Sequence, residues 1–321
     1  MLFKAYLSLA RNFPAGCDGL FGERLGGAPD LWLAVDAQGF PSLLLKSQAS
    51  DARSDIELRF VGVRFSRECE VTTAAGGSAR GAYTVVRLEE NDPELVRLFL
   101  RLMEEAFCGE HSPQSNREIG ERILELANLF RQAETSTKDI IGLWGELQVI
   151  SGAASIEGAT RCWCEHKNAK YDFVCDGFAL EVKSTLKTRR EHRFSLEQLR
   201  PPGGDLPVFV ASVQVVQAQS GKAIFELIDG ILGAIEDKDL RMAFLGLCLT
   251  KGGEDIYRNQ MRFQFLSRDA GVALYDANDV PVPHVVAGEP ISNVKFDVCL
   301  DALPHQTGAA RSRLLAMTGP A

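Results

Sequence analysis

The segment 171–184 constrains the fold of this 321-residue chain more than any other stretch. It places an Asp-Gly pair at 176–177 between two runs rich in β-forming residues, a pattern that predicts a hairpin with a two-residue type I′ turn. Pairing outward from this turn sets Asp172 directly opposite Glu181. Because side chains two residues apart share one face of a strand, Lys183 should lie beside Glu181, while the intervening apolar residues point into a core.

Two opposed carboxylates require a compensating interaction, because like charges directly across a sheet are destabilising. A divalent cation reverses that effect, since Mg²⁺ binds carboxylate oxygens and keeps several waters. A lysine beside the ion can stabilise an anionic group or position a water. Asp172, Glu181 and Lys183 together therefore predict metal-assisted hydrolysis of a phosphodiester.

At these residues the chain resembles the PD-(D/E)XK nuclease superfamily, with Asp172 as the aspartate and Glu181-Val182-Lys183 as the E-x-K motif. Tyr171 stands where the name of the superfamily has a proline, a position that varies among its members. A longer pattern resembles one uncharacterised bacterial family of PD-(D/E)XK members. It comprises Gly-Leu-Trp-Gly-Glu at 142–146, Tyr-Asp-Phe at 171–173, Glu-Val-Lys-Ser-Thr at 181–185, His192, and Ser-Leu-Glu-Gln-Leu at 195–199.

The resemblance implies an α/β fold, with a restriction-endonuclease-like mixed central sheet flanked by helices and an N-terminal β-rich region. It also implies a Mg²⁺-dependent endonuclease, with Mn²⁺ as the alternative ion. Asp172 and Glu181 would bind the metal together with the main-chain carbonyl of Val182. Lys183 would position or activate the attacking water and stabilise the developing charge. Glu146 would bind a second metal or orient a water on the first.

Charge bears on the substrate. A net charge of −8 argues against a protein that coats nucleic acid in general. Residues 161–200, however, hold nine Lys and Arg against six Asp and Glu, so a phosphate-contacting edge and a plain solvated loop both stay open. We expect a nuclease that acts on DNA. A catalytically silent binding or scaffold subunit, and an RNA-directed nuclease, are the alternatives.

The resemblance further implies a bacterial restriction or antiphage defence system, with a helicase and a methyltransferase as partners. The sequence has no apolar run long enough to span a membrane and no signal-like apolar segment at its start, so we expect a cytoplasmic protein. The eight cysteines are scattered, which predicts free thiols rather than disulfides or a structural zinc.

Two parts are expected, 1–110 and 111–321. The first is rich in β-forming residues, with predicted strands at Leu31–Val35 and 40–45, and it ends in a connecting helix that begins at Asp92. The second is expected to be the PD-(D/E)XK nuclease-like domain.

A helix is expected from Thr137 to about residue 150, with its apolar residues on one stripe. Glu146 lies at the margin of that stripe, where it either faces a cleft or is a solvated glutamate. Gly142 and Gly145 each weaken the helix by about 1 kcal/mol relative to alanine, unless a close neighbour compensates.

Later segments carry weaker signals. Ser195 and Gln198 fit a capping box, which we rank above a DNA contact for Gln198. His192 is more typical of a structural residue than of a phosphate contact. For the apolar run 242–249 we favour a strand over a helix, and we expect a mobile tail after Pro304.

Overall fold

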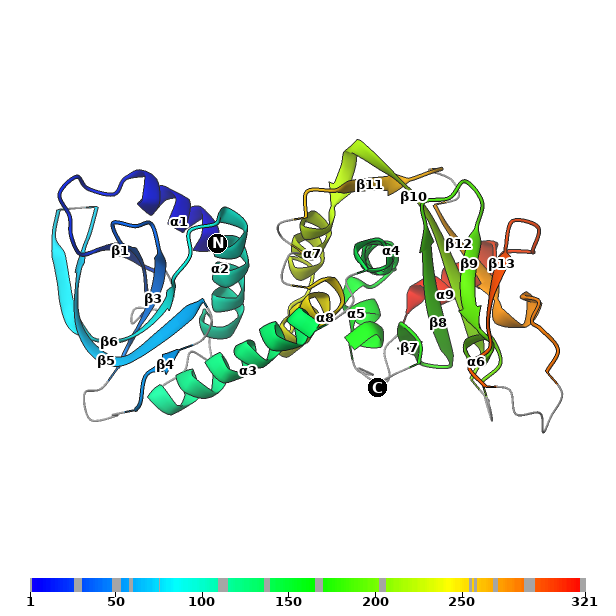
Figure 1. Cartoon of the computed structure of the whole chain (residues 1–321), viewed down its shortest axis with the longest axis horizontal. Coiled ribbons are helices and arrows are strands. Elements are labelled where there is room, and N and C mark those ends of the chain that lie inside the picture. The colour runs from blue at the N-terminus through cyan, green and yellow to red at the C-terminus, as the bar shows by residue number, and fades with distance from the viewer. Residues whose placement is uncertain are drawn as a thin grey trace. The chain divides into compact units, whose positions relative to one another are not determined.

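The computed structural model of the chain describes residues 2–25, 31–47, 53–57, 60–74, 76–108, 115–135, 139–164, 170–201, 206–253, 256, 259–267, 271–285 and 292–317. The chain forms two compact units, Met1–Glu134 and Thr135–Ala321 (Figure 1). The division falls later than the expected boundary near residue 110. The helix that follows this position stays with the first unit, where buried Asn116 donates to Ser66 Oγ over 2.9 Å and accepts from the Thr84 hydroxyl.

The first unit is β-rich, as expected. Its strands are β1 (Leu20–Arg24), β2 (Leu31–Val35), β3 (Pro41–Lys46), β4 (Ile56–Glu57), β5 (Val61–Thr72) and β6 (Ser78–Leu88). They form one sheet in the order β1-β2-β3-β6-β5-β4, and a pairing of β1 with β5 closes the sheet on itself. Its helices are α1 (Leu2–Arg11), α2 (Pro93–Phe107) and α3 (Asn116–Thr135), of which α1 was not predicted from the sequence. Asp92 caps α2 through the amides of Glu94 and Leu95, which confirms the predicted start.

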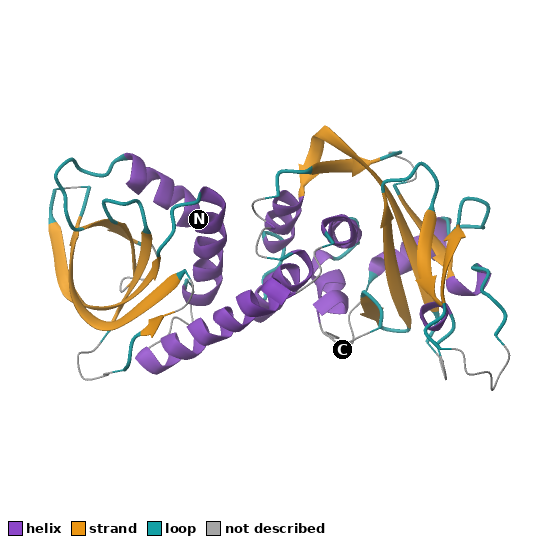
Figure 2. Ribbon diagram, in the orientation of Figure 1, coloured by secondary structure: helices purple, strands orange, loops and turns teal. Residues whose placement is uncertain are grey.

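The second unit mixes helices and strands (Figure 2). Its elements are α4 (Ile140–Ser151), α5 (Ile156–Cys164), β7 (Phe173–Cys175), β8 (Phe178–Thr185), β9 (Glu191–Ser195), α6 (Leu196–Leu199), β10 (Val208–Ala223), α7 (Ile224–Leu232), α8 (Lys238–Gly252), β11 (Arg262–Phe265), β12 (Val272–Asp276), the 3₁₀ turn η2 (Ala277–Asp279), β13 (Lys295–Cys299) and α9 (Gly308–Ala316).

The main sheet of this unit is mixed, which confirms the expected α/β class. β8 runs parallel to β10, and β7, β11 and β12 pair antiparallel with their neighbours. β9 and β13 form a separate antiparallel pair. Figure 1 shows α4, α5, α7 and α8 on one side of β8 and β10, with β9, β13 and α6 on the other side.

The predicted hairpin is present in the predicted register. Phe173 pairs with Leu180 and Cys175 with Phe178, around a turn at 176–177. Its predicted type I′ geometry is wrong, because Gly177 has a φ of +81° whereas Asp176 has no positive φ. A turn with a positive φ at its second central residue alone is type II-like, and glycine adopts that conformation without strain.

Three further predictions need correction. The run 242–249 is helical: it lies in α8, which Asp237 caps through the amides of Asp239 and Leu240. A helix also covers part of the tail after Pro304, namely α9, in which Leu314 is buried. Asp139 caps α4 through the amide of Gly142, whereas Thr137, the predicted cap, lies outside the described residues.

No helix in the described part of the chain combines the length and apolarity that crossing a membrane requires.

Candidate active site

Asp172 directly precedes the first residue of β7, and its side chain lies beside β8. The β7–β8 ladder ends at Phe173 and Leu180, one pair short of Asp172 and Glu181. The Val182 amide, which a longer ladder would pair with a main-chain carbonyl, donates instead to Asp172 Oδ2 over 2.9 Å. The aspartate side chain thus replaces a strand, and its carboxylate is fixed beside β8.

Glu181 and Lys183 lie on one face of β8, as the alternation of the strand predicts. Lys183 Nζ contacts Glu181 Oε1 at 2.6 Å and lies 5.9 Å from the centre of the Phe194 ring. Gln198 Nε2 donates to the same Glu181 oxygen over 2.7 Å. The Glu181 carboxylate is therefore buried and held from two sides, while Lys183 keeps 23% of its side chain exposed.

Gln198 has two functions at once. Its Oε1 accepts from the Ser195 amide over 3.1 Å, and Ser195 Oγ accepts from the Gln198 amide, which confirms the predicted capping box. Because Oε1 serves the cap, Nε2 points to Glu181. Sequence reasoning found the cap but missed this second contact.

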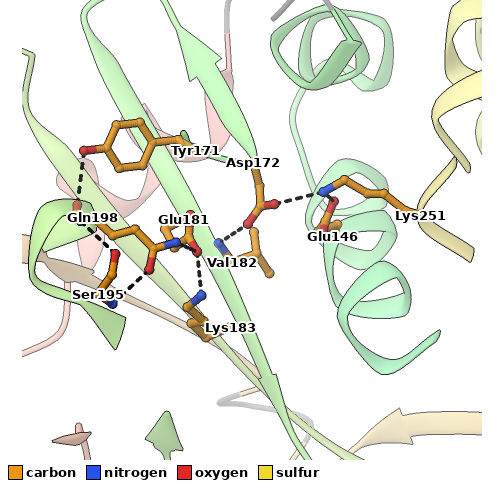
Figure 3. A network of polar contacts seen from close by, with 9 residues as sticks. All are labelled: Glu146, Tyr171, Asp172, Glu181, Val182, Lys183, Ser195, Gln198 and Lys251. Atoms are coloured by element: carbon orange, nitrogen blue, oxygen red, sulfur yellow. Dashed lines mark hydrogen bonds and ion pairs between the residues drawn. The ribbon is translucent and has the colours of Figure 1, made fainter. Parts of the chain in front are cut away.

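Glu146 comes from α4 and is buried instead of solvated. Its Oε2 accepts from Trp163 Nε1 and from Lys251 Nζ, each over 2.6 Å. Lys251 also donates to Asp172 Oδ1 over 2.9 Å, so one ammonium group bridges two carboxylates. Figure 3 shows Asp172 between two groups, with Glu146 and Lys251 on one side and Glu181, Lys183 and Gln198 on the other.

Lys251 is the residue that sequence reasoning missed. It lies in the last turn of α8, just after the run 242–249 for which a strand was favoured. A helical interpretation of 238–252 would have placed a cation near the helix C-terminus, where it interacts favourably with the helix dipole. The sequence offers no signal, however, for its contact with Asp172, which is 79 positions away in the chain.

The carboxylates are strongly perturbed. Burial, followed by the charge of Asp172, raises the pKa of Glu146 to about 8 and that of Glu181 to about 7, although the neighbouring lysines oppose both shifts. Burial is the larger cause of both shifts, and the crowding of the carboxylates adds to it. Burial would lower the pKa of Lys251, but Glu146 and Asp172 outweigh that effect and raise it.

His192 is structural, as favoured from the sequence. It is buried in β9, and its Nε2 lies 2.7 Å from Ser212 Oγ. Burial, helped by the charge of Arg190, lowers its pKa to about 4, so the ring is neutral near pH 7. Arg190 binds the same serine from its Nη1, with 2.6 Å to the carbonyl and 3.0 Å to the hydroxyl.

A basic cleft of about 440 Å³ opens beside the Glu181–Lys183 pair. Its lining includes four cationic side chains, from Lys170, Lys183, Arg193 and Lys295. The acidic member of the lining is Glu197, whose carboxylate lies 3.7 Å from Lys170 Nζ. The cleft is therefore positive, although the chain as a whole carries −8.

These observations define a class of protein. It is a mixed α/β unit that carries a cluster of carboxylates and lysines on and beside one strand of its main sheet, β8. A protein family described as "Putative PD-(D/E)XK family member" matches residues 26–301, so the chain belongs to this family and the suspected resemblance is confirmed. Neither the curated proteins nor the solved structures give a match to the chain.

Proposed function

We propose that this protein is a metal-dependent nuclease that hydrolyses phosphodiester bonds in DNA, on a restriction-endonuclease-like sheet. The observation that carries the proposal is the position of Asp172, which is held at the edge of β8 next to Glu181 and Lys183. Membership of the PD-(D/E)XK family supports the same chemistry. By the same resemblance, we assign it to bacterial restriction or antiphage defence, with helicase and methyltransferase partners.

The residues at the site fit a magnesium ion. Within the described residues, Glu181 Oε2 forms no hydrogen bond, and each Asp172 oxygen forms one, which leaves lone pairs for a cation. The described part of the chain contains no cluster of three His, Cys, Asp or Glu side chains that could hold a metal by themselves. Mg²⁺ does not need such a cluster, since it binds through one or two carboxylates and retains waters.

Asp172, Glu181 and the main-chain carbonyl of Val182 would hold the ion. When bound, a divalent cation polarises the phosphoryl oxygen and lowers the pKa of water. Lys183 lines the basic cleft, where its ammonium group can neutralise the charge that grows on the phosphate as water adds and the ester bond breaks. Gln198 holds Glu181 in place during this change.

The basic cleft supports a polyanionic substrate. Arg193 and Lys295 lie on neighbouring strands, β9 and β13, and form no ion pair with any of the described residues. Cations in this position would contact the backbone phosphates of the nucleic acid. They would thereby fix the position of the nucleic-acid strand relative to Lys183 without recognising the base sequence. Such contacts make affinity fall steeply with salt.

The test uses the purified full chain with supercoiled plasmid DNA and with structured RNA, each in Mg²⁺, Mn²⁺ or EDTA. We expect nicking or linearisation of the plasmid in either metal and none in EDTA. Cleavage that survives EDTA would contradict the metal mechanism. Cleavage of RNA alone would overturn the assignment to DNA.

Two variants of the same hairpin sharpen the experiment. Asp172→Asn removes the proposed metal ligand and should abolish cleavage. Asp176→Asn removes one carboxylate from the exposed turn of the hairpin and should cleave like the parent. If the parent binds plasmid but neither cuts nor responds to metal, the chain is a silent binding subunit and the proposal is wrong.

A further inference from the structure

The buried lysine between Glu146 and Asp172 bears on how many metal ions the proposed nuclease uses. Lys251 Nζ lies 2.6 Å from Glu146 Oε2 and 2.9 Å from Asp172 Oδ1, a position in which a cation shared by two carboxylates would lie. The same Glu146 oxygen also accepts from Trp163 Nε1. A metal ion approaching that oxygen would have to displace two donors.

The charge of the site points in the same direction. Its carboxylates are Glu146, Asp172 and Glu181, and its ammonium groups are Lys183 and Lys251. Fully ionised, these five side chains carry −1. One divalent cation and one phosphodiester, itself −1, then leave the site neutral. A second divalent cation would leave it at +2, in a place where burial penalises uncompensated charge.

The position of Lys251 is also built into the fold. It occupies the last turn of α8, so the helix dipole favours a cation there. Its Nζ lies 5.7 Å from the centre of the Trp163 ring, and only 29% of the side chain is exposed. The ammonium group is therefore held by the same residues that hold Glu146.

We propose that Lys251 supplies from within the chain the positive charge that a second metal ion would otherwise bring between Glu146 and Asp172, so that the site takes one divalent cation. The inference rests on the proposed function. It assigns Glu146 to Lys251 and not to a metal, and it makes Lys251 a positioning residue for Asp172.

The number of bound ions tests this directly. Mn²⁺ is titrated into the full chain, and free Mn²⁺ is followed by its electron paramagnetic resonance signal, with no substrate present. We expect one ion per chain. Two ions on the parent would overturn the inference and leave the proposed nuclease intact. No bound ion would contradict the proposed function itself.

Variants separate the roles of the two carboxylates. Lys251→Met removes the resident charge and should raise the stoichiometry from one ion to two, whereas Lys238→Met, on the exposed start of α8, should leave it at one. Glu146→Gln should retain the single ion with unchanged affinity, while Asp172→Asn should weaken it by more than about tenfold. Loss of binding in Glu146→Gln, or one ion on a folded Lys251→Met chain, would contradict the proposal. If Lys251→Met does not fold, the parent stoichiometry and Glu146→Gln still decide.

Discussion

Two lysines contact the carboxylates of the site, and their surroundings give them different functions. Lys183 contacts Glu181 and lines the basic cleft, where a substrate phosphate can reach it. Lys251 is anchored between Glu146 and Asp172 and does not line that cleft. Lys183 can therefore contact the substrate and stabilise the transition state. Lys251, held between two carboxylates, instead fixes the positions of Glu146 and Asp172.

Lys183→Met should therefore lower turnover by about 10²–10³ while nucleic-acid binding and the melting temperature stay close to the parent values. The side chain reaches a cleft and fills no core, and both proposed metal ligands remain. Single-turnover plasmid cleavage measures the rate, and gel shift in EDTA measures binding. Lys187→Met is the matched control, because Lys187 is 61% exposed and pairs only with Glu191 among the described residues. Equal rates for parent and Lys183→Met would refute the role assigned to Lys183.

At the scale of residues, the sequence predicted those relations between site residues that depend only on a short stretch of the chain. The Asp-Gly turn and strand alternation place Glu181 beside Lys183, because these relations need only neighbouring residues. The burial of Glu146 and its bond to Trp163 depend on how α4 and α5 pack, and the contact of Lys251 with Asp172 joins distant segments. Such contacts have no local signature.

At the scale of elements, the packing of α4 on β8 positions Glu146. A methyl group at Gly145 would overlap Ser184 Oγ and would lie 3.3 Å from Ser184 Cβ and 3.5 Å from Val213 Cβ. This is the close approach expected from the sequence to compensate a glycine in the helix. At Gly142, by contrast, the added methyl group would meet the side chain of Asp139, which caps α4.

Gly145→Ala should consequently destabilise the chain by about 1–3 kcal/mol through overpacking, reduced by the roughly 1 kcal/mol that alanine adds to a helix. Thermal unfolding followed by circular dichroism at 222 nm measures this loss. Ser184→Ala removes the overlapping hydroxyl, which is buried and has no partner among the described residues. The double variant should therefore melt near or above the parent. If the double variant is as unstable as Gly145→Ala, the contact with Ser184 is not what excludes a side chain.

Element types were predictable where a terminus carries its own signal. Asp92 before proline marked α2, and the Asp-Gly pair marked the β7–β8 hairpin. The apolar run in α8 was assigned to a strand because a short continuous apolar run fits a buried strand and a buried helix equally. Its cap, Asp237, lies before the apolar run and was overlooked. The eight cysteines are free thiols, as their spacing suggested.

For the whole molecule, the candidate site and the family match extend over different parts of the chain. Every residue of the candidate site lies in Thr135–Ala321, whereas the family match begins at residue 26 and therefore includes most of the β-rich unit. Composition predicted that the first unit is β-rich, because strand-forming residues and turns alternate there. Its closure through the β1–β5 pairing could not be predicted, since that contact joins strands far apart in the chain.

The two perturbed glutamates should make the stability of the whole chain fall as pH rises in the absence of metal, and a bound ion should oppose that fall. The folded-state pKa values, about 8 for Glu146 and about 7 for Glu181, lie above the ordinary 4.5. The metal-free folded chain thus retains protons that the unfolded chain has lost. This stabilisation is complete below pH 4.5 and disappears as pH rises through 7 to 8.

Buried His192 has the opposite effect below its ordinary pKa of 6.5, so it does not oppose the glutamates above that pH. Between pH 6.5 and 8.5 we expect the melting temperature to fall with pH in EDTA. In Mg²⁺ the stabilisation by the ion should grow over the same range, because the ion binds the deprotonated carboxylates. Melting curves in the two conditions should therefore diverge as pH rises.

Glu146→Gln removes one titrating group and should flatten the slope in EDTA while the divergence caused by Mg²⁺ persists. A melting temperature in EDTA that does not change over this range would show that both glutamates ionise normally in the folded chain.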